Sequence, residues 1–388
     1  MKVIIYTVDC FKERARLMPW RTILEVAKVM QEAGHKVAIL NACNKEEDAF
    51  DYEWAGIDGL YKEPVQIRSV LKTDEAVLIK LNELGPQSLY IPLTFREGIK
   101  PAKWIEKVTC KKIGYMAGGV YDLKSAWLLI QTAGLAVAKP YLLEALTSYR
   151  LFAHTMKQIG ISKIIGLTDT TTNSVKRSGF INALTIYPGK DPFDAIPAEI
   201  DIIKKYGLLG KKWFLFSGAP APARGAELLL KAIDRVKDET VRLVMLMRTD
   251  VGSVYKEFES KLETLKHPER VIVIREKLTR EQLRAFFCSA WYALLPFIVI
   301  PSEVPLTFFE LLCCGTPVIT FKNGGTTDYL HDGLLISDKS LHGLTDALEH
   351  AWKDARLRDN LSNNGKRIMS THPTWEEVGK QWEKLLSE

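Results

Sequence analysis

Short apolar runs along the chain alternate with longer stretches in which apolar residues recur every three or four positions. The run KVIIYTV at residues 2–8 predicts a strand, and the stretch from Trp20 to Ala33 has helical spacing that ends at Gly34. Residues 35–42, HKVAILNA, predict a second strand. The chain therefore begins with a strand-helix-strand unit.

This alternation continues through the first half of the chain and starts again in the second half. The further strand-like runs are SLYIPLT (88–94), KKIGYM (111–116), SKIIGLT (162–168), KKWFLFSG (211–218), VRLVMLM (241–247), RVIVI (270–274), WYALLPF (291–297) and PVITF (317–321). Helical patterns separate them, notably from Asp122 to Ile159. The pattern predicts an α/β protein with two tandem doubly wound Rossmann-like domains, each built on a parallel sheet covered on both faces. Ligands of such sheets bind beyond the carboxyl ends of the strands, so we expect a cleft between the domains.

The boundary between the two units is expected in YPGKDPFDAIPAE, where prolines and a glycine interrupt regular structure. We place the N-terminal domain at residues 1–188. A chain of 388 residues with 47% hydrophobic residues can fill two cores.

The formal charge of +6 is unevenly distributed. Residues 1–188 hold 25 Lys and Arg against 19 Asp and Glu, whereas residues 189–388 hold 28 of each kind. The basic half is compatible with an anionic partner and equally with solvated lysine faces. Nucleic-acid binding is not indicated.

The six cysteines form no C-x-x-C pair and no zinc-type spacing with histidine, so neither a metal site nor a disulfide scaffold is predicted. A strand-like run follows Met1 without a leader-like region, and we expect a cytoplasmic protein. The longest apolar stretch, Ala126 to Ala138, is shorter than the ~20 residues that span a bilayer. It is predicted to be a buried helix, or an interfacial one on an anionic membrane face.

One carboxylate, Glu310, lies in the apolar run FFELLCC. Its neighbours make a solvated helix face improbable, and burying an unpaired charge is costly. We therefore expect Glu310 to accept hydrogen bonds, with compensation of a helix dipole as the alternative.

Several motifs occur in the order typical of one enzyme family. They are YPGKD (187–191), SGAPAPARG (217–225), FFELLCCGTPVITFKNGG (308–325), HDGLLI (331–336) and THPTWEEVGKQWEKLL (371–386). The second half thereby resembles the donor domain of retaining GT-B glycosyltransferases of family 4, the glycosyl transferases group 1. The N-terminal half resembles the family only in general layout.

The resemblance implies that residues 1–188 bind an acceptor and that residues 189–369 bind a nucleotide-diphosphate sugar. Residues 370–388 would form a helix that crosses back to the first domain. The implied activity is sugar transfer with retention to a glycan, lipid-linked or small-molecule acceptor. No metal or other cofactor is expected, because cations and helix N-termini stabilise the leaving diphosphate in this fold.

The resemblance also implies roles for donor-site residues. Glu310 matches the acid that accepts hydrogen bonds from both ribose hydroxyls, and Arg224 matches the cation that binds the diphosphate close to Gly218. A second family cation is replaced by Ala219. Arg248 and Lys277 are candidates to compensate for it.

The family's first acid lies eight positions before the second, where this chain has Ser302, and Glu303 follows it. Either residue is a candidate ligand of the sugar. The backbone N–H groups of Leu306 and Thr307 are expected to face the diphosphate at a helix start.

The acceptor side is less defined. Arg14 and Arg16 follow the first strand, where they are candidates to contact phosphate. Gly118 and Gly119 stand where the family often has a catalytic histidine, so the catalytic residue is unknown. A catalytically inert relative that binds a nucleotide sugar or a protein partner, and a nucleotide-sugar epimerase, therefore remain alternatives.

Overall fold

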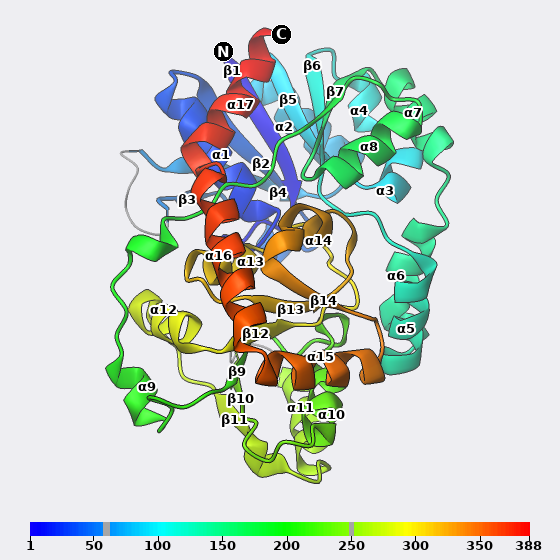
Figure 1. Cartoon of the computed structure of the whole chain (residues 1–388). Helices are drawn as coiled ribbons and strands as arrows, with labels where there is room; N and C mark the ends of the chain where they lie inside the picture. The colour runs from blue at the N-terminus through cyan, green and yellow to red at the C-terminus, as the bar shows by residue number, and fades with distance from the viewer. Residues whose placement is uncertain (57–62, 248–251) are drawn as a thin grey trace.

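The computed structural model describes residues 1–56, 63–247 and 252–388 (Figure 1). Its strands form two sheets, one in each half of the chain, with helices on both faces. The predicted α/β architecture with two Rossmann-like domains is therefore confirmed.

The first sheet has the strand order β3-β4-β2-β1-β5-β6-β7-β8 and is parallel except for the edge strand β3. Its strands are β1 (Lys2–Val8), β2 (Lys36–Cys43), β3 (Tyr52–Trp54), β4 (Val65–Leu71), β5 (Ser88–Leu93), β6 (Lys111–Met116), β7 (Ile161–Gly166) and β8 (Ala183–Thr185). The helices of this half are α1 (Trp20–Glu32), α2 (Asp74–Leu84), α3 (Phe95–Ile99), α4 (Trp104–Lys107), α5 (Leu123–Ala133), α6 (Leu135–Ala145), α7 (Tyr149–Gln158) and α8 (Asp169–Arg177).

The second sheet is parallel, in the order β11-β10-β9-β12-β13-β14. Its strands are β9 (Phe214–Ser217), β10 (Leu243–Leu246), β11 (Val271–Ile274), β12 (Tyr292–Leu295), β13 (Val318–Phe321) and β14 (Leu334–Ser337). The helices are α9 (Asp201–Lys205), α10 (Ala226–Arg235), α11 (Gly252–Glu263), α12 (Arg280–Ser289), α13 (Leu306–Cys313), α14 (Gly324–Leu330), α15 (Leu341–Lys353), α16 (Ala355–Thr371) and α17 (Trp375–Ser387). A short 3-10 helix, η4 (Pro222–Arg224), precedes α10.

Each sheet has a hydrophobic core on both faces because successive strand residues point in opposite directions. In β9, Phe214 and Phe216 pack into one core, whereas Leu215 packs into the other. In β1, Ile5 and Ile4 divide in the same way.

The chain passes between the domains twice, near Pro188 and near His372, and a hydrogen bond joins these two segments. His372, between α16 and α17, is buried and places its Nε2 2.8 Å from the carbonyl oxygen of Pro188. Because a carbonyl only accepts, Nε2 carries the proton, and Nδ1 accepts from the Tyr329 hydroxyl at 2.6 Å. Burial lowers the pKa of His372 from 6.5 to about 4, in keeping with a neutral ring.

The last helix, α17, packs on α1 of the N-terminal half (Figure 1). Trp382 of α17 is fully buried, its ring stacks on Tyr90 of β5, and its carbonyl accepts from the Tyr90 hydroxyl at 2.7 Å.

The apolar stretch from Ala126 to Ala138 forms parts of two helices, α5 and α6, rather than one. Gly134, with φ of 83°, separates them. None of the helices in the described ranges combines the length and apolar character that crossing a bilayer requires.

Candidate active site

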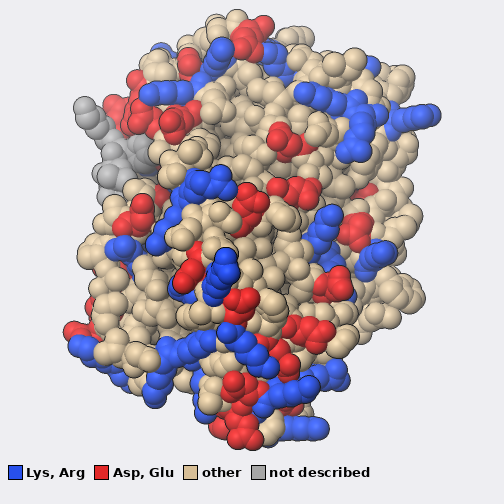
Figure 2. Space-filling model, in the orientation of Figure 1, with Lys and Arg blue, Asp and Glu red and all other residues tan. Residues whose placement is uncertain are grey.

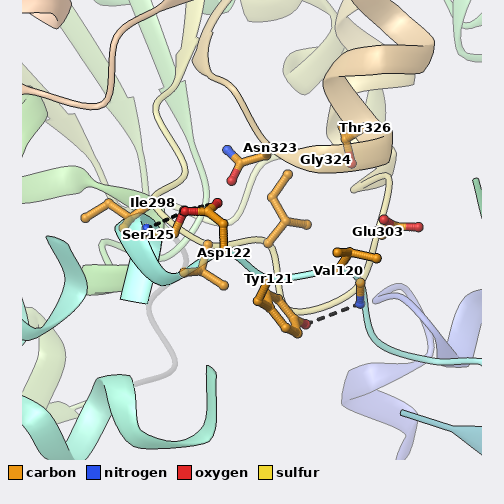
Figure 3. Close-up of a pocket in the computed structure, with 12 residues that line it drawn as sticks. Val120, Tyr121, Asp122, Ser125, Ile298, Glu303, Asn323, Gly324 and Thr326 are labelled. Atoms are coloured by element: carbon orange, nitrogen blue, oxygen red, sulfur yellow. Dashed lines mark hydrogen bonds between the residues drawn. The ribbon is translucent and has the colours of Figure 1, made fainter. Parts of the chain in front are cut away.

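A hollow of about 330 Å³, partly open to solvent, lies between the two domains. Figure 3 shows Tyr121 and Asp122 of the N-terminal half on one side of it and Asn323, Gly324 and Glu303 of the C-terminal half on the other. The lining comes from the loop after β6, the start of α5, and the loops after β12 and β13: Gly119, Val120, Tyr121, Asp122, Ser125, Ile298, Val299, Ile300, Glu303, Asn323, Gly324 and Thr326. The hollow therefore lies beyond the carboxyl ends of strands from both sheets.

Glu303 lines this hollow and is 4% exposed. Its carboxylate accepts hydrogen bonds of 2.6 Å from the hydroxyls of Thr168 and Thr171, at the start of α8 in the other domain. The backbone N–H groups of Gly325 and Val120 also donate to it. Burial raises the pKa of Glu303, and these four donors oppose that shift. An acid predicted to face the sugar thus also joins the two domains.

The loop after β6 fits closely against Glu303. A Cβ at Gly119 would come 2.8 Å from Cγ of Glu303, so only glycine fits there without displacing the acid. Gly118, its neighbour, is buried beside Thr94. Tyr121 donates from its hydroxyl to the carbonyl oxygen of Pro301 at 2.7 Å, which adds another link between the domains.

Lys339, just after β14, forms a further interdomain contact that sequence reasoning missed. Its ammonium donates to the Ser125 hydroxyl and to Asn323 Oδ1 at 3.2 Å, and lies 3.7 Å from Asp122 Oδ2. Burial lowers the pKa of Lys339, whereas the charge of Asp122 opposes this. Lys339 therefore ties the start of α5 to the C-terminal sheet. Only the fold brings it there, because it lies more than 200 residues from Ser125.

Arg224, in η4, lies at the carboxyl end of β9. Its guanidinium is 5.6 Å from the Phe297 ring centre, and its Nη1 would be 1.9 Å from a Cβ built at Gly218. Gly218, with φ of 132°, therefore leaves the space that the guanidinium occupies. The Phe297 ring in turn contacts Phe308 of α13, with ring centres 6.0 Å apart. The two predicted diphosphate-site residues, Gly218 and Arg224, are thus in contact.

The start of α13 is free of side-chain capping, since Pro305 at its N-cap offers no hydrogen-bonding side chain. The N–H groups of Leu306 and Thr307, in the first turn, have no acceptor within the helix. Ser302, in the preceding loop, has a buried hydroxyl without a hydrogen-bond partner in the described structure. This end of the helix is a suitable place for an anion.

Glu310 lies one turn along α13 and is half-buried. It borders a second hollow with Leu306 and Phe309 of the same helix and with Lys190 and Asp191 of the YPGKD turn. Two of the motifs identified in the sequence therefore meet at this hollow.

Asp191 of that turn is held from three sides. Its carboxylate oxygens lie 2.8 Å from Arg21 Nη2 of α1, 2.8 Å from the Trp375 indole nitrogen and 3.5 Å from Arg280 of α12. Arg21 also pairs with Glu25 at 3.0 Å. These contacts link both domains and the last helix beside the hollow that contains Glu310.

The remaining sequence candidates lie apart from these two hollows. Lys277 is exposed after β11, and Arg248 lies outside the described residues. Arg14 lies 3.8 Å from Asp9 and over the Trp20 ring, and Arg16 is exposed beside it. Thr168, Thr171 and Lys339 are the site residues that the sequence did not single out.

Comparison with known proteins relates part of the chain to a family and the whole chain to a fold. Residues 199–368 match the family model described as Glycosyl transferases group 1. YtcC of Bacillus subtilis (strain 168), which carries a provisional glycosyltransferase name, is 25% identical over 190 residues, covering 46% of this chain and 46% of YtcC. The match thus spans about half the length of that curated relative.

Solved structures match over the whole chain. Sucrose-phosphate synthase from Thermosynechococcus elongatus has a TM-score of 0.74 at 14% identity, with 100% of this chain and 98% of that one covered. HepE of Anabaena, in complex with UDP and glucose, has a TM-score of 0.68 at 13% identity, with 100% and 99% covered. Likeness at such low identity shows the fold. Residues 199–368 therefore match the glycosyl transferases group 1 family model, and the whole chain has the GT-B fold.

Proposed function

We propose that the chain transfers a sugar from a nucleotide-diphosphate sugar to a hydroxyl group of an acceptor, with retention of the anomeric configuration. The observation that carries this proposal is the grouping of Arg224, the uncapped start of α13 and Glu310 along one edge of the C-terminal sheet. All three lie in the segment that matches the glycosyltransferase family.

In this proposal Glu310 accepts hydrogen bonds from the two ribose hydroxyls, since a carboxylate has two oxygens that match a vicinal diol. Arg224 and the N–H groups of Leu306 and Thr307 bind the diphosphate. As the bond between the sugar and the diphosphate breaks, negative charge builds on the diphosphate, and these groups stabilise that charge. The reaction proposed here requires no metal ion, because the protein itself supplies positive charge to the leaving group.

The sugar itself would occupy the interdomain hollow beside Glu303 and Asn323. The acceptor hydroxyl would approach from the side of Tyr121 and Asp122, which belong to the N-terminal half. Retention then requires that the hydroxyl attack from the face of the sugar that the diphosphate leaves. A glycan, a lipid-linked sugar or a small molecule would each satisfy this chemistry.

We propose a cytoplasmic location for this reaction. The six cysteines are free thiols, which fits a reducing compartment.

The test is incubation with UDP-, GDP- and ADP-sugars together with glycan, lipid-linked and small-molecule acceptors, followed by detection of free nucleoside diphosphate and NMR of any new glycosidic bond. We expect release of a nucleoside diphosphate and a product in which the transferred sugar has the same anomeric configuration as in the donor. Ala219, which removes one cation of the family pattern, makes an inert binder the competing function. Nucleotide binding without release would support that function, and recovery of an epimerised nucleotide sugar would identify an epimerase instead.

A further inference from the structure

The large hydrophobic side chains that the described structure leaves exposed are concentrated in one short part of the chain. Trp127 is 61% exposed, Leu135 58% and Leu146 63%. Half of the exposed large hydrophobic residues lie between residues 123 and 151, on α5 and α6, directly after α6 and at the start of α7: Leu123, Trp127, Leu135, Val137, Leu146 and Leu151. We call these six exposed residues together the docking face.

The exposed charged residues within α5, α6 and α7 are all basic, whereas Asp122, at the N-cap of α5, is an exposed acid that lies 3.7 Å from Lys339. Lys124, Lys139, Arg150 and Lys157 are all exposed on the same three helices. Glu144 is the only acid between Asp122 and Asp169, and it is buried, where its carboxylate accepts from the Arg96 N–H at 3.1 Å. Figure 2 shows Lys and Arg side chains gathered at the upper right, over the position of α7 and α8 in Figure 1, and both basic and acidic side chains lower on the right, beside α5 and α6. The docking face therefore combines apolar groups with positive charge.

The opposite side of α5 and α6 is buried in the other domain. Leu129 and Ala138 belong to the same hydrophobic core as Leu228 and Ile298 of the C-terminal half. Figure 1 shows α5 and α6 lying along the side of that half. These helices are thus fixed in place on one side, and the six residues of the docking face belong to none of the hydrophobic cores in the described part of the chain.

The helix pair α5 and α6 is also connected to the candidate active site. Helix α5 packs on η4, which carries Arg224, and its Ser125 receives the hydrogen bond from Lys339. Asp122 and Ser125, at the start of α5, line the interdomain hollow. A molecule bound at the docking face would therefore lie next to the acceptor side of that hollow.

We propose that the docking face binds an anionic lipid bilayer, which presents a lipid-linked acceptor to the hollow. The bilayer proposal depends on the proposed sugar transfer in one respect, which is that the bilayer carries the acceptor. A tryptophan among leucines and lysines suits the boundary between headgroups and acyl chains, and the lysines attract anionic lipids. Pairing with a second copy of the chain is disfavoured, because a twofold contact would bring the same lysines together.

The test is flotation of the full chain with vesicles of phosphatidylcholine containing phosphatidylglycerol, and with vesicles of phosphatidylcholine alone, at low and high salt. We expect binding to the anionic vesicles that weakens with salt. The double variants W127S/L135S and K124E/K139E are each expected to reduce binding by about tenfold or more. Phe50→Ser, at an exposed aromatic residue outside the docking face, and the double variant K211E/K266E, in the C-terminal half, serve as matched controls that keep wild-type binding.

Absence of flotation with anionic vesicles, or equal binding by the two docking-face variants and wild type, would overturn the proposal. Dimerisation of the chain that W127S/L135S abolishes would also overturn it, in favour of a second copy as the occupant. Nucleotide binding measured on the same variants separates the two proposals. Nucleotide binding should be unchanged in the docking-face variants. Absence of nucleotide binding in wild type would count against the transfer reaction alone.

Discussion

The carboxylate of Glu303 accepts a hydrogen bond of 2.6 Å from the hydroxyl of Thr168, although the two residues belong to different domains. Thr171 makes an equal bond to the same oxygen, Oε2. A buried acid at the edge of the interdomain hollow is therefore satisfied by the opposite domain. The arrangement couples the position of the two domains to a group that we propose faces the donor sugar.

The double variant T168V/T171V should destabilise the protein. Both hydroxyls donate to a buried carboxylate, and each bond to a charged group contributes about 1.5–3 kcal/mol, so we expect a loss of about 3 kcal/mol or more. Urea unfolding followed by circular dichroism measures it. Thr170→Val is the matched control, because Thr170 lies in the same turn but donates to Asp328 at a more exposed place. A double variant as stable as that control would show that these hydroxyls do not hold Glu303 in solution.

Gly218→Ala should weaken binding of a nucleoside diphosphate by about tenfold, because the new Cβ would occupy the place of the Arg224 guanidinium. Calorimetric titration with UDP, GDP and ADP measures this effect. Gly210→Ala is the control, since Gly210 also has a positive φ, of 73°, but nothing within 4 Å of the added atom. Unchanged affinity in Gly218→Ala would mean that the position of Arg224 does not matter for the ligand.

His372 should make the fold sensitive to acid. Its pKa is lowered to about 4 by burial, whereas the unfolded chain has the ordinary value of 6.5. The unfolded state therefore takes up a proton first, and stability is lost as the pH falls from 6.5 towards 4, by about 3 kcal/mol in all.

His372→Gln should remove most of this pH dependence, whatever it does to the stability at neutral pH. Unfolding free energies across the same pH range give the comparison. His342→Gln, at a histidine whose side chain is 87% exposed, should leave the slope as in wild type. An equally steep acid slope in His372→Gln would assign the sensitivity to other groups.

Local patterns were sufficient to predict much of the fold. The buried strands of both sheets are short apolar runs, and the motif order around Glu310 indicated the GT-B architecture that the structure has. Strand β4 was missed, because VQIRSVL alternates apolar and polar residues and lacks the continuous apolar run of the central strands.

The interdomain contacts were beyond local reasoning. Thr168 and Glu303 are 135 residues apart, and Lys339 and Asp122 lie on different domains. Nothing in the spacing of such residues marks them as partners, because only the packing of α8 and α5 against the C-terminal half brings them together. The sequence could therefore predict residues on one side of the hollow, but not the interdomain hydrogen bonds and ion pairs that hold them in place.

The central claim is that Glu310 binds the nucleotide of a sugar donor, and calorimetric titration of wild type and Glu310→Gln with UDP, GDP and ADP tests it most directly. Glu269→Gln, at an exposed acid in the same domain, is the control. We predict that one of the diphosphates binds wild type and the control equally, and Glu310→Gln at least about tenfold more weakly, since a charged acceptor is lost. Binding of none of the three to wild type, or equal binding to Glu310→Gln, would contradict the account.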